Sequence, residues 1–217
     1  MNRRTVAGLC LLASPVLHLV SYFLWPAHSE GSTATQLAAA AAHPGQMALA
    51  SLVETLGWVL LLPALAVLWG EVRGRGAVLV GIGVWGGVLG VLGFAVSGVL
   101  NLVTIDLGRT SGGAAAFDAV RHDGRMVASV VLPILLGLLA LVVLLAGLAR
   151  AGLGGWWMPV AGFVAVAADQ VLSESENALL LSAAFLPMAM PLALIGVRLL
   201  SARTAPDRTT APVPATA

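Results

Sequence analysis

The chain has 217 residues, of which 59% are hydrophobic and 10% charged, and its mean hydropathy is +0.97. A water-soluble domain of this length needs far more charge to cover its surface, so the composition excludes that class. The single cysteine, Cys10, excludes an intrachain disulfide, and the net charge of +1 gives no indication of nucleic-acid binding.

Six segments are long and apolar enough, or nearly so, to cross a hydrocarbon core of ~30 Å as helices. They cover residues 6–25, 46–69, 77–103, 126–149, 156–172 and 178–200. The first is longer than the apolar part of a signal peptide and lacks a cleavage site, so we expect it to be retained. The sequence predicts an all-α membrane bundle in a single domain, residues 1–200, with six transmembrane helices paired as three hairpins.

The connections differ in length and character on the two sides of the bundle. Residues 26–45 and 104–125 contain alanine-rich stretches that predict two short interfacial helices on the outer side, capped by Ser32 or Thr33 and by Ser111. Residues 201–217 are rich in Thr, Pro and Ala without an apolar period, which predicts a disordered cytoplasmic tail.

The arginines predict the orientation, because cytoplasmic loops carry an excess of basic residues. With the N-terminus inside, eight arginines are cytoplasmic and three are outside, at positions 109, 121 and 125. We expect a multi-pass protein of the cell (plasma) membrane with both termini in the cytoplasm.

A repeat of 79 residues is predicted from the two outer loops. His43 begins the segment HPGQM and His122 begins HDGRM, and both segments read H-x-G-x-M just before a predicted helix. The same shift superimposes the first span on the third, so we interpret the unit of helix, outer interfacial helix, H-x-G-x-M and helix as a parallel tandem repeat. The last hairpin, residues 156–200, would be a shortened third copy without the outer helix. The alternative is chance similarity between Ala-, Gly- and Leu-rich segments.

Glu54 is the carboxylate in the second predicted span, where a charge is expensive and normally faces the bundle interior. At ~1.5 Å per residue, His18 lies about 18 Å from the inner end of the first span, and Glu54 about 12 Å from the outer end of the second. In a core of ~30 Å these are the same depth. We therefore predict that His18 and Glu54 pair.

Further polar or aromatic side chains at helical spacing extend this locus into an outward-facing cavity, with Asp169 as its third ionisable member. The other expected members are Ser14, Tyr22, Ser51, Trp58, Ser97, Asn101 and Gln170. The alternative is that Glu54 and His18 form a hydrogen-bonded pair that only fixes helix register.

Three histidines are candidate metal ligands: His28, His43 and His122. None has the close i, i+4 spacing typical of a metal site, and His43 and His122 each precede a helix whose free N–H groups they can serve. The structural interpretation is favoured, and no cofactor is expected. The motifs of common nucleotide-binding, hydrolytic and metalloprotease sites are absent, so an enzyme is disfavoured.

The layout resembles a family of six-helix integral membrane proteins of unknown function from actinobacteria. The resemblance depends on Arg3, Arg4 and Gly8 at the start, on the two H-x-G-x-M segments and on the alanine-rich outer loops. It implies a membrane location and supplies no activity. The favoured function is binding or passing a small ligand or a proton through the cavity. An accessory membrane subunit is the alternative, and a haem or metal protein or enzyme is less favoured still. Partners beyond the lipid bilayer and the oligomeric state have no sequence signal.

Overall fold

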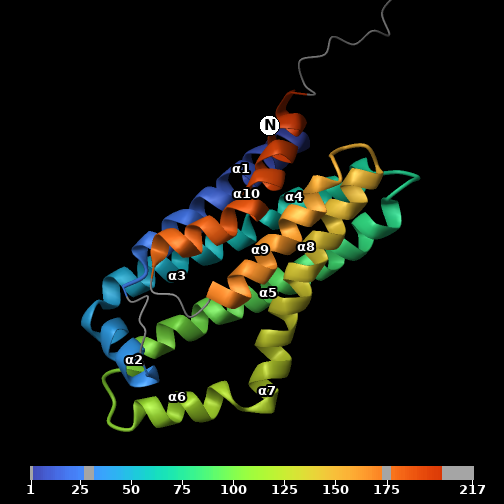
Figure 1. The fold of residues 1–217 in the computed structure, drawn as a ribbon. Coiled ribbons are helices and arrows are strands. Elements are labelled where there is room, and N and C mark those ends of the chain that lie inside the picture. The colour runs from blue at the N-terminus through green and yellow to red at the C-terminus, as the bar shows by residue number, and fades with distance from the viewer. Residues whose placement is uncertain (1, 27–31, 173–176, 202–217) are drawn as a thin grey trace, which may run out of the picture.

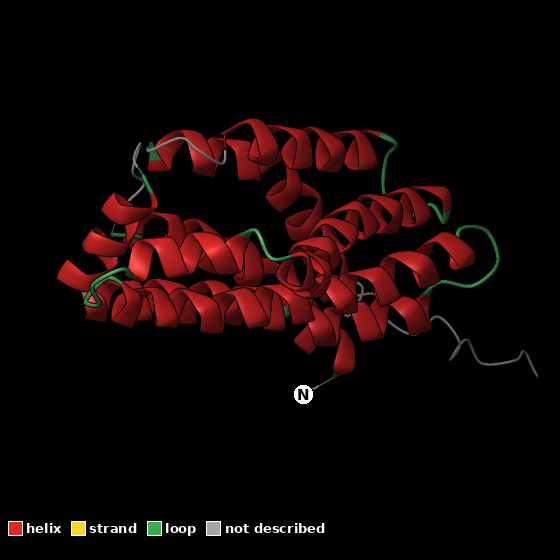
Figure 2. Ribbon diagram, turned by 90° about the horizontal axis from the view of Figure 1, so that it is seen from below, coloured by secondary structure: helices red, strands yellow, loops and turns green. Residues whose placement is uncertain are grey.

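The chain folds into a bundle of helices, shown by a computed structural model that describes residues 2–26, 32–172 and 177–201 (Figure 1). Within these ranges the secondary structure is helical, and no strand is present (Figure 2). His28 and the predicted tail beyond Ser201 lie outside the described residues. The predicted all-α class is therefore confirmed.

Within the described residues, five helical segments are long and apolar enough to cross a membrane. They are α1 (Arg3–Leu24), α3 with α4 (Pro44–Val59 and Leu61–Glu71), α5 (Ala77–Leu107), α7 with η1 and α8 (Gly124–Met126, Val127–Val131 and Leu132–Arg150) and α10 (Ala178–Ser201). The remaining apolar helix, α9 (Trp157–Leu172), has 16 residues. Its length is about 24 Å at ~1.5 Å per residue, which is short of a hydrocarbon core.

Two of the long segments are interrupted near a proline, because proline lacks an N–H and its ring displaces the carbonyl four residues earlier. The second segment breaks at Leu60, three residues before Pro63. Just before Pro133, the Leu132 N–H bonds to the Val127 carbonyl, five residues back, which makes η1 a short π-helix.

Two pairs of packed helices, α1 with α10 and α5 with α8, run antiparallel. The start of α1 lies against the end of α10, where a Cβ on Gly8 would be 2.8 Å from the Leu200 side chain. The most extensive packing joins α5 to α8, and a Cβ on Gly90 would be 2.6 Å from the Gly137 Cα. Gly90 is thus at a close approach of two helices within the chain.

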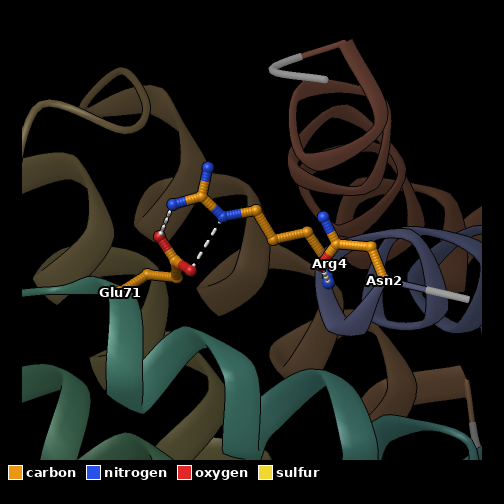
Figure 3. A network of polar contacts seen from close by, with 3 residues as sticks. All are labelled: Asn2, Arg4 and Glu71. Carbon is orange, nitrogen blue, oxygen red and sulfur yellow. Dashed lines mark hydrogen bonds and ion pairs between the residues drawn. The ribbon is translucent and has the colours of Figure 1, made fainter. Parts of the chain in front are cut away.

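Two arginines, Arg4 and Arg198, form hydrogen bonds at the end of the bundle that holds the N-terminus. Arg4 donates from Nε and Nη2 to the two carboxylate oxygens of Glu71, over 2.8 and 2.6 Å, which joins the start of α1 to the end of α4 (Figure 3). Asn2 caps α1 by accepting from the Arg4 N–H. Arg198 of α10 also donates to the carbonyl of Leu153, in the turn after α8.

Two short helices, α2 (Thr33–Ala42) and α6 (Gly113–Arg121), lie at the opposite end of the bundle (Figure 1). They correspond to the two short helices expected in the outer loops, and Thr33 of α2 donates a 2.6 Å hydrogen bond to Asp118 of α6. The predicted cap at Ser111 is wrong, because α6 is preceded by Gly112 with a φ of 81° that favours glycine. The tandem repeat stays a prediction.

Large apolar side chains cover the outside of the bundle as well as its core. Val78 is 76% exposed, and Val171 and Leu179 are exposed to a similar degree. A water-soluble protein would bury such side chains, whereas a membrane protein turns them to lipid.

Candidate functional site

A cavity of about 290 Å³ lies inside the bundle, between α1, α3, α5, α8, α9 and α10. Its lining combines two carboxylates and a histidine with a majority of aromatic and aliphatic side chains. The lining residues are His18, Ser21, Tyr22, Trp25, Glu54, Trp58, Phe94, Leu138, Ala165, Val166, Asp169, Leu181, Phe185 and Met188.

His18, on α1, is 3% exposed and carries one unpartnered ring nitrogen. Its Nδ1 donates to the Ser14 carbonyl over 3.2 Å, because a carbonyl oxygen can only accept. In the neutral ring Nε2 is then an acceptor, and it has no hydrogen-bond partner among the described residues. The ring is held by Trp58, edge-on at 4.2 Å, and by Phe185, stacked at 5.1 Å.

Trp58, on α3, places a second unpartnered polar atom at the cavity. The side chain is 6% exposed, and its Nε1 has no hydrogen-bond partner in the described part of the chain. The indole stacks on Phe94 of α5 with ring centroids 3.7 Å apart. An indole N–H can only donate, so Trp58 adds an unused donor to the unused acceptor on His18.

Glu54 and Asp169 bring two carboxylates to the same cavity from α3 and α9. Glu54 forms no hydrogen bond or ion pair with another described residue, whereas Asp169 accepts a 3.4 Å hydrogen bond from Gln170. Neither carboxylate is neutralised by an arginine, because no arginine belongs to the described lining and the chain has no lysine.

The direct pairing predicted between His18 and Glu54 is not formed. Both side chains line the cavity, but the imidazole bonds back to the Ser14 carbonyl of its own helix. Trp58, one turn along α3 from Glu54, packs against the imidazole instead, with the two ring planes nearly perpendicular. The two residues line the same cavity with no hydrogen bond between them.

The remaining residues expected at this locus divide into two groups. Tyr22 lines the cavity with its ring edge-on to Phe185 at 6.3 Å. Ser14 and Ser51 are buried beside the lining, and the Ser51 hydroxyl has no partner among the described residues. Neither serine belongs to the lining, and Ser97, Asn101 and Gln170 lie outside it as well.

The sequence predicted two aromatic residues of the lining, Tyr22 and Trp58, but not Phe94 or Phe185. Phe94 and Phe185 lie among many other apolar residues on α5 and α10, so neither position stands out from its neighbours. Trp25 fits an interface anchor by its place at the end of a span, yet it also lines the cavity.

The histidines considered as metal ligands are dispersed. His43 and His122 are exposed, and His122 donates from Nδ1 to the Asp118 carbonyl over 2.8 Å. In the described ranges no three His, Cys, Asp or Glu side chains gather as a metal site requires. His28 lies outside them.

Comparison with known proteins adds no family to this geometry. No protein-family model matches the chain, and neither the curated proteins nor the solved structures include a significant match. The site is therefore interpreted from its own chemistry.

Proposed function

We propose that this chain is a multi-pass protein of the cell membrane that binds a small ligand in the cavity between α1, α3 and α9. Six crossings, in three antiparallel hairpins, would place both termini in the cytoplasm and α2 and α6 at the outer surface. The eight-to-three distribution of arginines supports this orientation. The Arg4–Glu71 pair would then lie at the cytoplasmic end.

The short helix α9 is compatible with a crossing. It packs against both α8 and α10, and its length is about 6 Å less than a typical hydrocarbon core. A mismatch of this size is accommodated by local thinning of the bilayer or by neighbouring helices, at a modest free-energy cost.

One observation carries the ligand-binding proposal: two polar ring nitrogens, on His18 and Trp58, are buried beside the same cavity without a partner among the described residues. Leaving a buried donor or acceptor unsatisfied destabilises a protein by ~1–3 kcal/mol per group. Groups that served only to fix helix register would bond to each other, and these do not. A ligand or ordered water in the cavity would satisfy both.

The cavity volume favours a molecule over a bare proton as the occupant. About 290 Å³ is close to the lower end of small-molecule sites, which span ~300–1,000 Å³. Its lining is mostly apolar with a few convergent polar groups, which is the usual composition of such sites.

Cysteine labelling tests whether the cavity admits small molecules. In a Cys10→Ala background, Ala165→Cys places a thiol at the lining, whereas Ala64→Cys places one in the packed core. Ala165 is 4% exposed and Ala64 is 0% exposed, so the pair is matched in burial. We expect methyl methanethiosulfonate, a small neutral reagent, to modify Ala165→Cys in liposomes and to leave Ala64→Cys unmodified. Equal protection of both thiols would overturn the proposal and favour an accessory membrane subunit with a closed interior.

A further inference from the structure

We infer that the ligand of this cavity is an organic cation, namely a protonated amine attached to an apolar body. The inference rests on the proposed ligand-binding function and names the chemical class that the lining selects. It depends on the juxtaposition of Glu54 and Asp169 with the unpartnered His18 nitrogen and with the aromatic rings of the same cavity.

The carboxylates in the cavity lining favour a ligand with a positive charge. Two carboxylates line the cavity, and its described lining includes no arginine to balance them. Ionisable groups within a membrane normally find a partner of opposite charge, because an isolated charge there is expensive. A cation in the cavity would supply that partner, whereas an anion would add a third negative charge.

The rings provide a second attraction for the same ligand. Five aromatic residues line the cavity: Tyr22, Trp25, Trp58, Phe94 and Phe185. Aromatic faces attract ammonium groups, by ~0.5–1 kcal/mol when exposed and by ~2 kcal/mol or more when desolvated. They also bury the apolar body that a free inorganic cation lacks.

Hydrogen bonding favours a protonated amine among cations. His18 Nε2 accepts in the neutral ring, so its missing partner is a donor. An ammonium group has N–H donors for this nitrogen and for the carboxylates. Because it cannot accept, the Trp58 N–H would bond to an ordered water beside it. A bare metal ion is disfavoured, because the described residues do not gather three His, Cys, Asp or Glu ligands in one place.

The test compares three probes of one shape and different charge. Phenethylammonium, phenethyl alcohol and phenylacetate are each titrated against the modification of Ala165→Cys by methyl methanethiosulfonate, in phosphatidylcholine liposomes. We expect the ammonium to protect the thiol at a concentration at least tenfold lower than the alcohol, and the anion to protect it least. Glu54→Gln and Asp169→Asn should each reduce that tenfold difference, while Asp106→Asn, which removes an exposed carboxylate outside the lining, should leave it unchanged.

The outcomes separate the two proposals. A thiol that never reacts means that the cavity is closed, which overturns the proposed function itself. A thiol that reacts but is protected equally by alcohol and ammonium, is protected best by the anion, or is not protected by the ammonium, overturns the assignment to cations while the cavity stays accessible. The comparison of probes on the parent Ala165→Cys protein keeps the inference falsifiable if a carboxylate variant fails to fold.

Discussion

At the scale of single residues, the orientation of His18 depends on the missing side chain of Gly57. A Cβ at position 57 would lie 2.5 Å from His18 Nδ1 and 2.9 Å from its Cε1. Glycine on α3 therefore makes room for the imidazole. Trp58, the next residue, packs its ring nearly perpendicular to the imidazole.

Gly57→Ala should consequently destabilise the protein. The imidazole is enclosed by Trp58 and Phe185, so it cannot move aside freely, and overpacking of this kind costs about 1–3 kcal/mol. Thermal unfolding in detergent, followed by circular dichroism, should show a lower midpoint.

Gly70→Ala is the matched control, because a Cβ at Gly70 would meet no atom within 4 Å. Alanine is the better helix former by ~0.5–1 kcal/mol, so this variant should unfold at the same or a higher temperature. Similar midpoints for both variants would contradict the role given to Gly57.

The sequence predicts the polar members of the site better than their bonds. His18, Glu54 and Asp169 stand out as ionisable residues in apolar spans, and counting rise per residue places His18 and Glu54 at one depth. The hydrogen-bond partner of each His18 nitrogen depends on the side-chain rotamer. That rotamer is determined by the Ser14 carbonyl and by the space beside Gly57. Both features depend on how α1 packs against α3, and a periodic pattern in the sequence does not predict them.

At the scale of elements, the most extensive packing in the bundle is between α5 and α8. The glycine-rich sequence of the third span predicts close packing, and its partner is α8 of the same chain. Interruptions are harder to place: Pro63 and Pro133 indicate that a helix departs from regularity, but a break at Leu60 and a π-turn at Val127–Val131 are different solutions to the same missing N–H.

Gly90→Leu should separate these two helices. A leucine side chain has no space where a single Cβ would be 2.6 Å from the Gly137 Cα, so we expect a loss of more than about 1–3 kcal/mol or a failure to fold. Yield of monodisperse protein and the unfolding midpoint measure the effect.

Gly81→Leu, on the same helix, tests whether bulk alone is responsible. No atom lies within 4 Å of a Cβ at Gly81, so this variant should retain the yield and midpoint of the parent. Equal damage from both substitutions would argue against a tight α5–α8 interface.

The Arg4–Glu71 pair links α1 to α4, and it should act as a unit. Arg4→Gln and Glu71→Gln should each lower the unfolding midpoint slightly, and the double variant should lose less than the sum of the two. The effect should be small and should decrease in high salt, because the Arg4 side chain is 44% exposed. If the decreases in midpoint simply add and do not change with salt concentration, the two residues act independently.

At the scale of the whole molecule, composition and hydropathy predict a helical membrane protein, and the helices found are long and apolar enough for that class. The sixth crossing stays a prediction, because α9 has only 16 residues. The hydropathy of a short span does not determine how the bilayer adapts to its length.

Single cysteines in a Cys10→Ala background test the proposed sidedness. Thr110 is exposed between α5 and α6, and Arg75 is exposed in the turn before α5. In intact cells, a membrane-impermeant maleimide should label Thr110→Cys, and it should label Arg75→Cys only after the membrane is permeabilised. The reverse pattern would invert the orientation inferred from the arginines.

We propose above that His18 Nε2 and Trp58 Nε1, which have no partner among the described residues, face a cavity that is open to a ligand. A high-resolution electron cryo-microscopy structure of the full chain in lipid nanodiscs tests it most directly. We predict density for ordered water or a bound molecule in the cavity, within hydrogen-bonding distance of His18 Nε2 and Trp58 Nε1. A dry interior, with protein side chains packed against both nitrogens, would contradict this account.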